Sequence, residues 1–294
     1  MPRTGIMLAY PYEPKRLSQW ASTGPAYGYI QPKLDGIRCR SILMNETATL
    51  LSSEENEFHS LPTLSKILSA FSSHYGRDLE LDGELYLSNG NFQRLCSLAK
   101  RNTPSEEEFL VEYHIFDVFD PYNEDLSQED RFDLRQKVFD SLNSMSEFCS
   151  EFIREVPTFK VPLLEESINP ILASFIESGY EGFILRKADA PYYRKRTTTM
   201  LKMKPRKEDS YKIVGFVEEI SIEGTPKGSL GSLQLSDGTG EIFSVGTGSF
   251  LTRENRNLLW ETRESLLGKT ATIKYQDLTS DRKVPRFPAL ISIS

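Results

Sequence analysis

A short charged segment broken by a proline, residues 204–209 (KPRKED), divides the 294-residue chain into two parts with different sequence patterns. Proline has no backbone N–H to donate, so it interrupts strands and helices, and charged residues around it are typical of a surface connection. A chain of this length is sufficient for two ordinary domains. We therefore expect one domain in residues 1–205 and a second in residues 206–294.

The second part consists of short β-type runs separated by turns that contain glycine. Five such runs are predicted, at residues 211–222, 229–235, 241–246, 270–275 and 287–293. One helix interrupts them over residues 253–267, with Thr252 as its N-cap and Gly268 as its stop. Five strands and one helix in fewer than ninety residues predict a small all-β barrel. The leading candidate is the OB-fold, a five-stranded barrel that often binds nucleic acid.

The first part mixes helical and strand-like patterns, which predicts an α+β domain. Apolar residues recur at helical spacing over residues 61–71, and Ser127 begins a capping-box pattern in front of a second apolar stripe. Asn169 is predicted as the N-cap of a third helix that has a proline in its first turn and ends at Gly179. An apolar strand follows at residues 182–185.

Charge is distributed unevenly along the chain. The net charge of −7 at pH 7 argues by itself against a nucleic-acid partner. However, residues 103–155 contain 15 acidic and 4 basic residues, whereas residues 186–207 contain 9 basic residues and one acidic residue. Binding to a polyanion depends on local charge, so the basic stretch is either a phosphate-binding surface or a solvated surface run.

Zinc-binding, disulfide-rich and membrane proteins are disfavoured classes. The cysteines and histidines are scattered, at Cys39, Cys96, Cys149, His59, His74 and His114. Their spacing supports neither a disulfide framework nor a zinc site. No apolar run approaches the ~18–20 residues of a membrane helix, and the first residues carry prolines and charges where a signal peptide would be apolar. We therefore expect a cytoplasmic protein, or one in the nucleic-acid compartment of its host cell, that is neither secreted nor bound to a membrane.

The strongest chemical motif is KLDGIR at residues 33–38. Lys33 precedes a tight Asp-Gly turn and Arg38 follows closely, which suits a nucleophilic amine that faces a phosphate. The structural alternative is a surface hairpin with Asp35 and Gly36 at its turn. This motif alone therefore does not decide the function.

Four further motifs follow in order along the chain. They are DGE at residues 82–84, FD at 116–117, EGFILR at 181–186 and LKMKP at 201–205. Together with the lysine motif, the series resembles the covalent nucleotidyltransferase superfamily of DNA ligases, RNA ligases and mRNA capping enzymes. Its spacing is similar to that of the small two-domain viral and phage ATP-dependent DNA ligases. The resemblance implies an α+β, ATP-grasp-like nucleotidyltransferase domain of antiparallel sheets and helices, followed by an OB-fold barrel.

The resemblance assigns the covalent chemistry to lysines. Lys33 would attack the α-phosphorus of ATP, form lysyl-AMP and release pyrophosphate. Lys202 and Lys204 lie two residues apart on one predicted strand, so they are expected to project to the same face and to neutralise charge on the α-phosphate. Asp35 would contact the ribose or support catalysis.

The same resemblance implies which groups hold the nucleotide. Phe116 would stack on adenine, and Arg38 would touch the nucleotide or the 5′-phosphate of a nick. Glu84 and Glu181 would contact the ribose or Mg²⁺, with Mn²⁺ as a substitute, because a hard cation prefers carboxylate oxygens. Taken singly, Phe116 could instead belong to the core and Glu181 to a solvated turn.

The expected partner is nicked double-stranded DNA, bound by a monomer. Arg194, Lys195 and Arg196 precede the LKMKP strand, where small ligases also carry basic residues, and they would grip the DNA backbone at the nick. Four segments of the second part resemble the OB domain of ligases, at residues 228–233, 243–248, 275–278 and 284–288. The resemblance implies that this domain clamps the minor groove opposite the nick.

Two stretches depart from the ligase pattern. Small ligases usually carry Ser-Arg-x-Gly between the first two motifs, with the arginine on the nick phosphates, whereas residues 51–58 (LSSEENEF) are acidic here. Either another basic residue substitutes for that arginine, or the contact is lost. Ligases also often end in a basic motif, for which Arg282, Lys283 and Arg286 are the candidate replacements.

The resemblance favours an ATP-dependent DNA ligase that seals 5′-phosphate/3′-hydroxyl nicks through lysyl-AMP on Lys33, AppDNA and attack by the 3′-hydroxyl. An RNA ligase or a GTP-using capping enzyme would use Lys33 similarly, so the choice of DNA rests on the OB-domain segments. The remaining alternative is a non-catalytic OB-fold DNA-binding protein with a decayed nucleotide site. The intact lysines and glutamates argue against that alternative.

Overall fold

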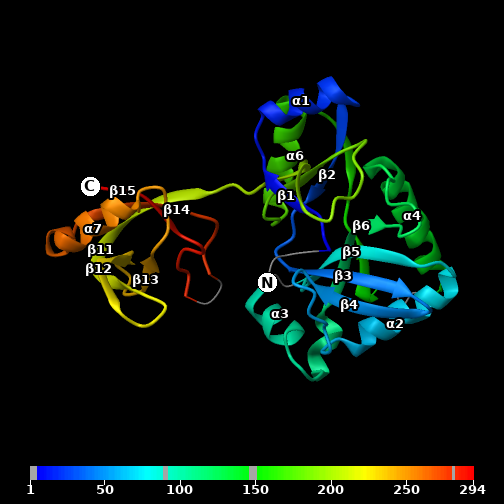
Figure 1. Cartoon of the computed structure of the whole chain (residues 1–294), viewed down its shortest axis with the longest axis horizontal. Coiled ribbons are helices and arrows are strands. Elements are labelled where there is room, and N and C mark those ends of the chain that lie inside the picture. Colours follow the sequence, from blue (N-terminus) through cyan, green and yellow to red (C-terminus); the bar gives the residue numbers. More distant parts are fainter. Residues whose placement is uncertain (1–4, 89–91, 146–150, 280–281) are drawn as a thin grey trace. The chain divides into compact units, whose positions relative to one another are not determined.

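The chain divides into two compact units, Met1–Met203 and Lys204–Ser294, in a computed structural model (Figure 1). The structure describes residues 5–88, 92–145, 151–279 and 282–294. The division falls two residues before the boundary expected from the sequence. Strand β10 ends at Met203 and β11 begins at Lys207, so the connecting segment is shorter than residues 204–209.

The first unit contains two five-stranded sheets in its described residues. Across the first sheet the order is β1 (Leu8–Pro11), β10 (Arg196–Met203), β9 (Phe183–Lys187), β2 (Tyr27–Pro32) and β8 (Phe159–Pro162). Across the second sheet it is β4 (Thr47–Ser52), β3 (Ile37–Met44), β5 (Leu79–Tyr86), β6 (Glu112–Phe119) and β7 (Ile153–Glu155). Neighbouring strands are antiparallel, as expected, except for the parallel pairs β1–β10 and β6–β7.

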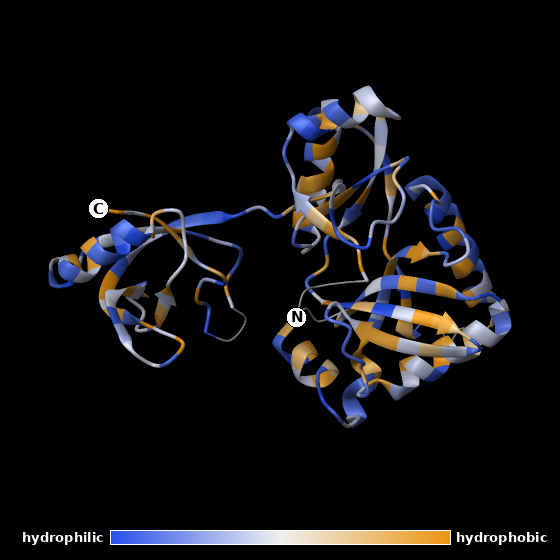
Figure 2. Ribbon diagram, in the orientation of Figure 1, coloured by the Kyte–Doolittle hydropathy of each residue, from blue (hydrophilic) through white to orange (hydrophobic). Residues whose placement is uncertain are grey.

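Helices flank both sheets and bury apolar side chains against them. They are α1 (Lys15–Thr23), α2 (Pro62–Tyr75), α3 (Phe92–Ala99), α4 (Gln128–Met145) and α6 (Glu165–Glu177), with a 3₁₀ turn at Glu106–Leu110. Phe71 of α2 and Val138 of α4 share one apolar cluster with Leu81 of β5. Trp20 of α1 and Ile168 of α6 belong to a separate cluster with strands of the first sheet. Apolar residues accordingly recur along these strands and helices (Figure 2).

Two of the three helices predicted in this unit begin where the sequence indicated. Helix α2 covers the predicted apolar stripe and begins at Pro62, a residue suited to the first turn of a helix. Before α4, the Ser127 hydroxyl accepts a hydrogen bond from the backbone N–H of Asp130 at 3.1 Å, and the Asp130 carboxylate accepts one from the Ser127 N–H at 3.2 Å. The capping box is therefore confirmed.

The predicted N-cap at Asn169 is wrong. Helix α6 begins at Glu165, and Pro170 lies inside the helix. Ile168 is fully buried, so burial of this side chain extends the helix in the N-terminal direction beyond the local capping signal. Two glutamates in the first turn also stabilise the positive end of the helix dipole. The predicted stop is confirmed, because Gly179 follows the helix with φ of +86°.

The second unit forms a single five-stranded antiparallel sheet in its described residues. The order is β13 (Ile242–Val245), β12 (Pro226–Ser236), β11 (Lys207–Ile220), β14 (Thr270–Tyr275) and β15 (Ala289–Ile293). These strands confirm all five predicted β runs. Helix α7 (Arg253–Glu261) is shorter than predicted, because a 3₁₀ turn at Arg263–Leu266 replaces its last turn. Thr252 caps it as expected, with its hydroxyl 3.2 Å from the Asn255 N–H.

The described residues include two of the three cysteines. Cys39 lies in β3 and Cys96 in α3, whereas Cys149 lies outside the described residues. Within the described ranges, no helix combines the length and the apolar character that a membrane crossing requires.

The cap of α4 gives a direct test of the local structure. Replacing the cap in Ser127→Ala leaves the Asp130 N–H without its acceptor, so we expect the free energy of unfolding to fall by about 1 kcal/mol. Urea denaturation followed by circular dichroism measures the change. Ser73→Ala is the matched control, because Ser73 is an exposed residue within α2 and should change stability little. Equal effects of the two substitutions would contradict the capping role.

Candidate active site

The segment that carries Lys33 connects β2 to β3 and is bound through its backbone to the EGFILR segment. The Lys33 N–H donates to the Gly182 carbonyl at 2.9 Å, and the Glu181 N–H donates to the Lys33 carbonyl at 3.0 Å. Gly182 has φ of +146°, a region that favours glycine over residues with a side chain. Two motifs almost 150 residues apart in sequence are therefore adjacent in space.

Gly36 allows this connection to lie directly against β5. A Cβ atom at this position would lie 2.2 Å from the Leu85 carbonyl oxygen and 2.5 Å from Cγ of Glu84. The first contact is with backbone, which cannot rotate away as a side chain can. The glycine of the lysine motif is thus required for close packing beside Glu84, not only for a turn.

The Lys33 ammonium group makes an ion pair with Glu181. Their Nζ and Oε2 atoms are 2.7 Å apart, and Nζ also donates to the Leu34 carbonyl at 3.1 Å. The two side chains are 20% and 16% exposed, so the pair is shielded but reachable from solvent. Glu181 therefore orients the amine and is not a solvated turn residue.

A cleft of about 780 Å³ lies in the first unit and is lined by residues from both of its sheets. Five of the predicted site residues line it: Lys33, Arg38, Glu84, Phe116 and Lys202. Gln31 and Arg186, which the sequence analysis did not assign to the site, line it as well. The cleft thus combines a primary amine, an aromatic ring, a carboxylate and several cations.

Phe116 lies between two guanidinium groups at this cleft. Cζ of Arg38 is 4.5 Å from the centre of the Phe116 ring, and Cζ of Arg186 is 5.3 Å from it. Both distances fall in the range of cation–π attraction. Phe116 is only partly buried, and it is therefore not simply a core residue.

Behind Phe116, Asp117 forms a fully buried cluster with two arginines. Its Oδ2 lies 2.7 Å from Nη1 of Arg186, and its Oδ1 lies 3.0 Å from Nε of Arg131. Burial raises the pKa of this carboxyl group, but the two guanidinium groups outweigh burial and hold the pKa below its ordinary value. The signal for this cluster is a charge inside an apolar strand, which requires a buried partner.

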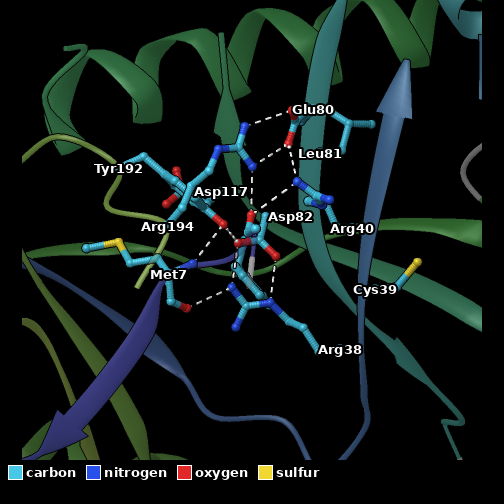
Figure 3. Close-up of polar contacts among 12 residues, drawn as sticks. Met7, Arg38, Cys39, Arg40, Glu80, Leu81, Asp82, Asp117, Tyr192 and Arg194 are labelled. Carbon is cyan, nitrogen blue, oxygen red and sulfur yellow. Dashed lines mark hydrogen bonds and ion pairs between the residues drawn. The ribbon is translucent and has the colours of Figure 1, made fainter. Parts of the chain in front are cut away.

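A second buried network holds Arg38 (Figure 3). Nε of Arg38 donates to Oδ1 of Asp82 at 2.6 Å. The Tyr192 hydroxyl donates to the same carboxylate and accepts a hydrogen bond from the Met7 N–H at 3.1 Å. Burial is the main cause that raises the pKa of Tyr192, and the negative charge of Asp82 raises it further. Asp82 therefore belongs to the site as the group that orients Arg38, a role that the DGE motif did not reveal.

Glu84 has a pKa of about 7, raised from its ordinary value of 4.5. Burial disfavours its charged form, while the nearby positive charges of Lys33 and Arg38 oppose that effect only partly. The charges of Asp82 and Glu181 raise the pKa further. Glu84 thus titrates near neutral pH when no cation is bound beside it.

The three basic residues predicted to bind DNA make contacts within the first unit. Arg194 pairs with Glu80 at 2.8 Å and donates to the Gly5 carbonyl, and Arg196 donates to the Ala9 carbonyl at 2.6 Å. Lys195 lies 5.9 Å from the Tyr193 ring. Lys195 and Arg196 are exposed and Arg194 is partly exposed, so a DNA contact stays a prediction for all three. Arg194 and Arg196 also hold the N-terminal segment, a role that the sequence analysis missed.

Lys202 and Lys204 do not share a strand, contrary to the prediction. Lys202 lies in β10, which ends at Met203, and the proline at 205 provides no N–H to continue the pairing. Lys204 belongs to the second unit, where its ammonium group donates to Gln276 at 3.3 Å. Asp35 lies in the connection between β2 and β3 but does not line the cleft.

The carboxylates of the site fit a divalent cation only together with other ligands. Among the residues that the structure describes, no group of three or more Asp, Glu, His or Cys side chains is arranged to hold a metal ion. Glu84 and Glu181 are close enough for their charges to interact. Mg²⁺ usually binds through one or two carboxylates, phosphate oxygens and waters, so this pair fits a cation that arrives with a nucleotide.

The raised pKa of Glu84 predicts a pH-dependent gain of stability in Glu84→Gln. Between pH 4.5 and 7 the folded protein holds more protons at Glu84 than the unfolded chain, so its unfolding free energy falls as pH rises. The neutral glutamine avoids this loss. We expect the variant to be more stable than the parent at pH 8 by roughly 1–3 kcal/mol, and much less so at pH 5.

Urea unfolding in buffer with EDTA at the two pH values measures this difference. Glu106→Gln is the control, because Glu106 is exposed and lies outside the cleft. A gain in Glu84→Gln that is the same at pH 5 and pH 8 would contradict the shifted titration.

Comparisons with known proteins match both parts of the chain to DNA ligase domains. The family model of the ATP-dependent DNA ligase domain matches residues 6–204, and that of the DNA ligase OB-like domain matches residues 223–293. The DNA ligase of African swine fever virus (strain Badajoz 1971 Vero-adapted) is 26% identical over 267 residues, which cover 87% of this chain and 61% of the viral protein. The chain thus spans about three fifths of the length of that relative.

Solved structures show the same fold. The structure of a protein called Pmar-Lig has a TM-score of 0.81 at 24% identity and covers all of this chain and 68% of its own. A structure of a Lig E DNA ligase has a TM-score of 0.72 at 22% identity and covers 99% of both chains. The expected α+β domain followed by an OB-like domain is confirmed. The chain belongs to the family of ATP-dependent DNA ligases.

Proposed function

We propose that this protein is a monomeric ATP-dependent DNA ligase that seals 5′-phosphate/3′-hydroxyl nicks in duplex DNA. The observation that carries the proposal is the position of Lys33, whose amine lines one cleft with Arg38, Phe116 and Lys202. An aromatic ring suits a stacked base, and cations suit phosphates. The cleft therefore offers complementary groups for each part of an adenine nucleotide around a nucleophile.

Lys33 performs the first chemical step. Its unprotonated Nζ attacks the α-phosphorus of ATP, so that a P–N bond forms and the P–O bond to pyrophosphate breaks. Before this attack the ammonium group must lose a proton, and the Glu181 carboxylate, whose Oε2 lies 2.7 Å away, is within reach to accept it. Lys202, in the same cleft, stabilises negative charge on the transferring group.

The two remaining steps transfer AMP and join the DNA ends. The 5′-phosphate of the nick attacks lysyl-AMP, which frees the Lys33 amine and gives AppDNA. The 3′-hydroxyl then attacks the 5′-phosphate, and AMP leaves. Arg38, held by Asp82 at the cleft, contacts the nucleotide or the nick phosphate, and the exposed Lys195 and Arg196 contact the DNA backbone.

Mg²⁺, or Mn²⁺ in its place, completes the site in this proposal. Glu84 and Glu181 would hold the cation together with phosphate oxygens of ATP. When bound, it neutralises charge on the phosphates. Glu84 would then bind it as a carboxylate, which opposes the raised pKa of this group in the absence of a cation.

The test is sealing of a singly nicked duplex with ATP and Mg²⁺ by the parent, Lys33→Ala and Lys66→Ala. Lys66 is an exposed lysine of α2 outside the cleft. We expect the parent and Lys66→Ala to become labelled with AMP and to seal, and Lys33→Ala to do neither. On a nick already carrying 5′-linked AMP, Lys33→Ala should seal, because the lysine acts as nucleophile only in the first step.

Different outcomes separate the alternatives. Sealing from ATP by Lys33→Ala would refute the covalent mechanism. Labelling of the parent by GTP in place of ATP, or sealing of RNA nicks alone, would support a capping enzyme or an RNA ligase. Binding of duplex DNA without any labelling of Lys33 would support a non-catalytic DNA-binding protein.

A further inference from the structure

Two cations immediately after helix α3, Lys100 and Arg101, line the cleft without forming an ion pair in the described residues. Their side chains form no hydrogen bond or ion pair with any residue of the described ranges, whereas Lys33, Arg38 and Arg186 in the same cleft are bonded to carboxylates. Both residues are exposed. Uncompensated positive charge in a concave site attracts anions and concentrates them there.

A buried hydrogen bond places these cations beside the acidic stretch that replaces Ser-Arg-x-Gly. Ser60, which is 1% exposed, donates its hydroxyl hydrogen to the Ala99 carbonyl at 2.8 Å. This bond joins the end of α3 to the chain that directly follows residues 51–58. Glu54 and Glu57 of that stretch line the same cleft as Lys100 and Arg101.

We propose that Lys100 and Arg101 bind backbone phosphates of the DNA at the nick, in place of the missing arginine. The inference rests on the proposed function, since it names the residues that recognise the DNA substrate. The phosphates of ATP belong near Lys33 and Lys202, which lie beside β9 and β10 of the first sheet. Lys100 and Arg101 lie instead next to the segment that follows residues 51–58, the stretch where small ligases carry the arginine that contacts the nick, so a phosphate of the nick is assigned as their partner.

The test compares Lys100→Ala/Arg101→Ala with Lys66→Ala/Lys137→Ala in the full chain. The control pair removes the same charge from exposed positions of α2 and α4 outside the cleft. Affinity for a singly nicked duplex is measured by fluorescence anisotropy at several salt concentrations without ATP. The KM for ATP is measured separately, by labelling of Lys33.

For the Lys100/Arg101 double variant we expect a roughly ten-fold or larger loss of affinity at low salt. The plot of log affinity against log salt should become less steep by about 1.8, because each phosphate contact contributes about 0.9. The KM for ATP should not rise. The control pair should keep the affinity and the slope of the parent.

A rescue variant separates direct contact from a structural role. Glu57→Arg, added to Lys100→Ala/Arg101→Ala, returns an arginine to the stretch where the family carries one. We expect it to restore part of the affinity and part of the salt slope. A structural defect at the end of α3 would not be repaired by a charge on a different segment.

Three results would overturn the inference. They are an unchanged salt slope in the double variant, an equal loss in the control pair, and a raised KM for ATP with intact binding of the nick. The last result would assign both cations to the nucleotide.

If the parent itself neither becomes labelled nor seals, the proposed function fails. A parent that seals, with a double variant that binds the nick equally well, refutes only this inference.

Discussion

The buried ion pair between Asp117 and Arg186 joins the two sheets of the first unit, and the geometry of the site depends on it. Asp117 belongs to β6 of the second sheet and Arg186 to β9 of the first. Arg131 of α4 binds the other carboxylate oxygen. Removing one partner of such a pair typically costs about 3–5 kcal/mol, because the remaining charge stays buried without compensation. The two sheets are therefore held in one arrangement by charge as well as by apolar packing.

The functional groups sit next to this junction on both strands. Phe116 directly precedes Asp117, and its carbonyl accepts a hydrogen bond from Gln31 of β2 at 2.8 Å, which is a second link between the sheets. Strand β9 begins directly after the Glu181–Gly182 pair that binds the backbone of Lys33. The junction that holds the sheets together thus also helps to hold the aromatic ring and the nucleophile at one cleft.

The sequence predicted those features that local chemistry determines. The caps at Ser127 and Thr252 and the five strands of the second unit depend on neighbouring residues, and the structure contains them. Asn169 has equally good capping chemistry, but burial of Ile168 against the first sheet outweighs it. Such packing depends on residues distant in sequence, as do the partners of Asp117 and Arg38. Motif order located the site, whereas these non-local contacts supply its geometry.

Charge counted along the chain is a poor guide to charge available to a ligand. The basic stretch at residues 186–207 includes Arg186, which is buried against Asp117, and Arg194, which is paired with Glu80. Lys100 and Arg101 follow no basic run and precede an acidic stretch, yet they line the cleft without a partner in the described part of the chain. A polyanion responds to uncompensated charge at a surface. The pairing of each cation, more than its place in the sequence, therefore determines where DNA can bind.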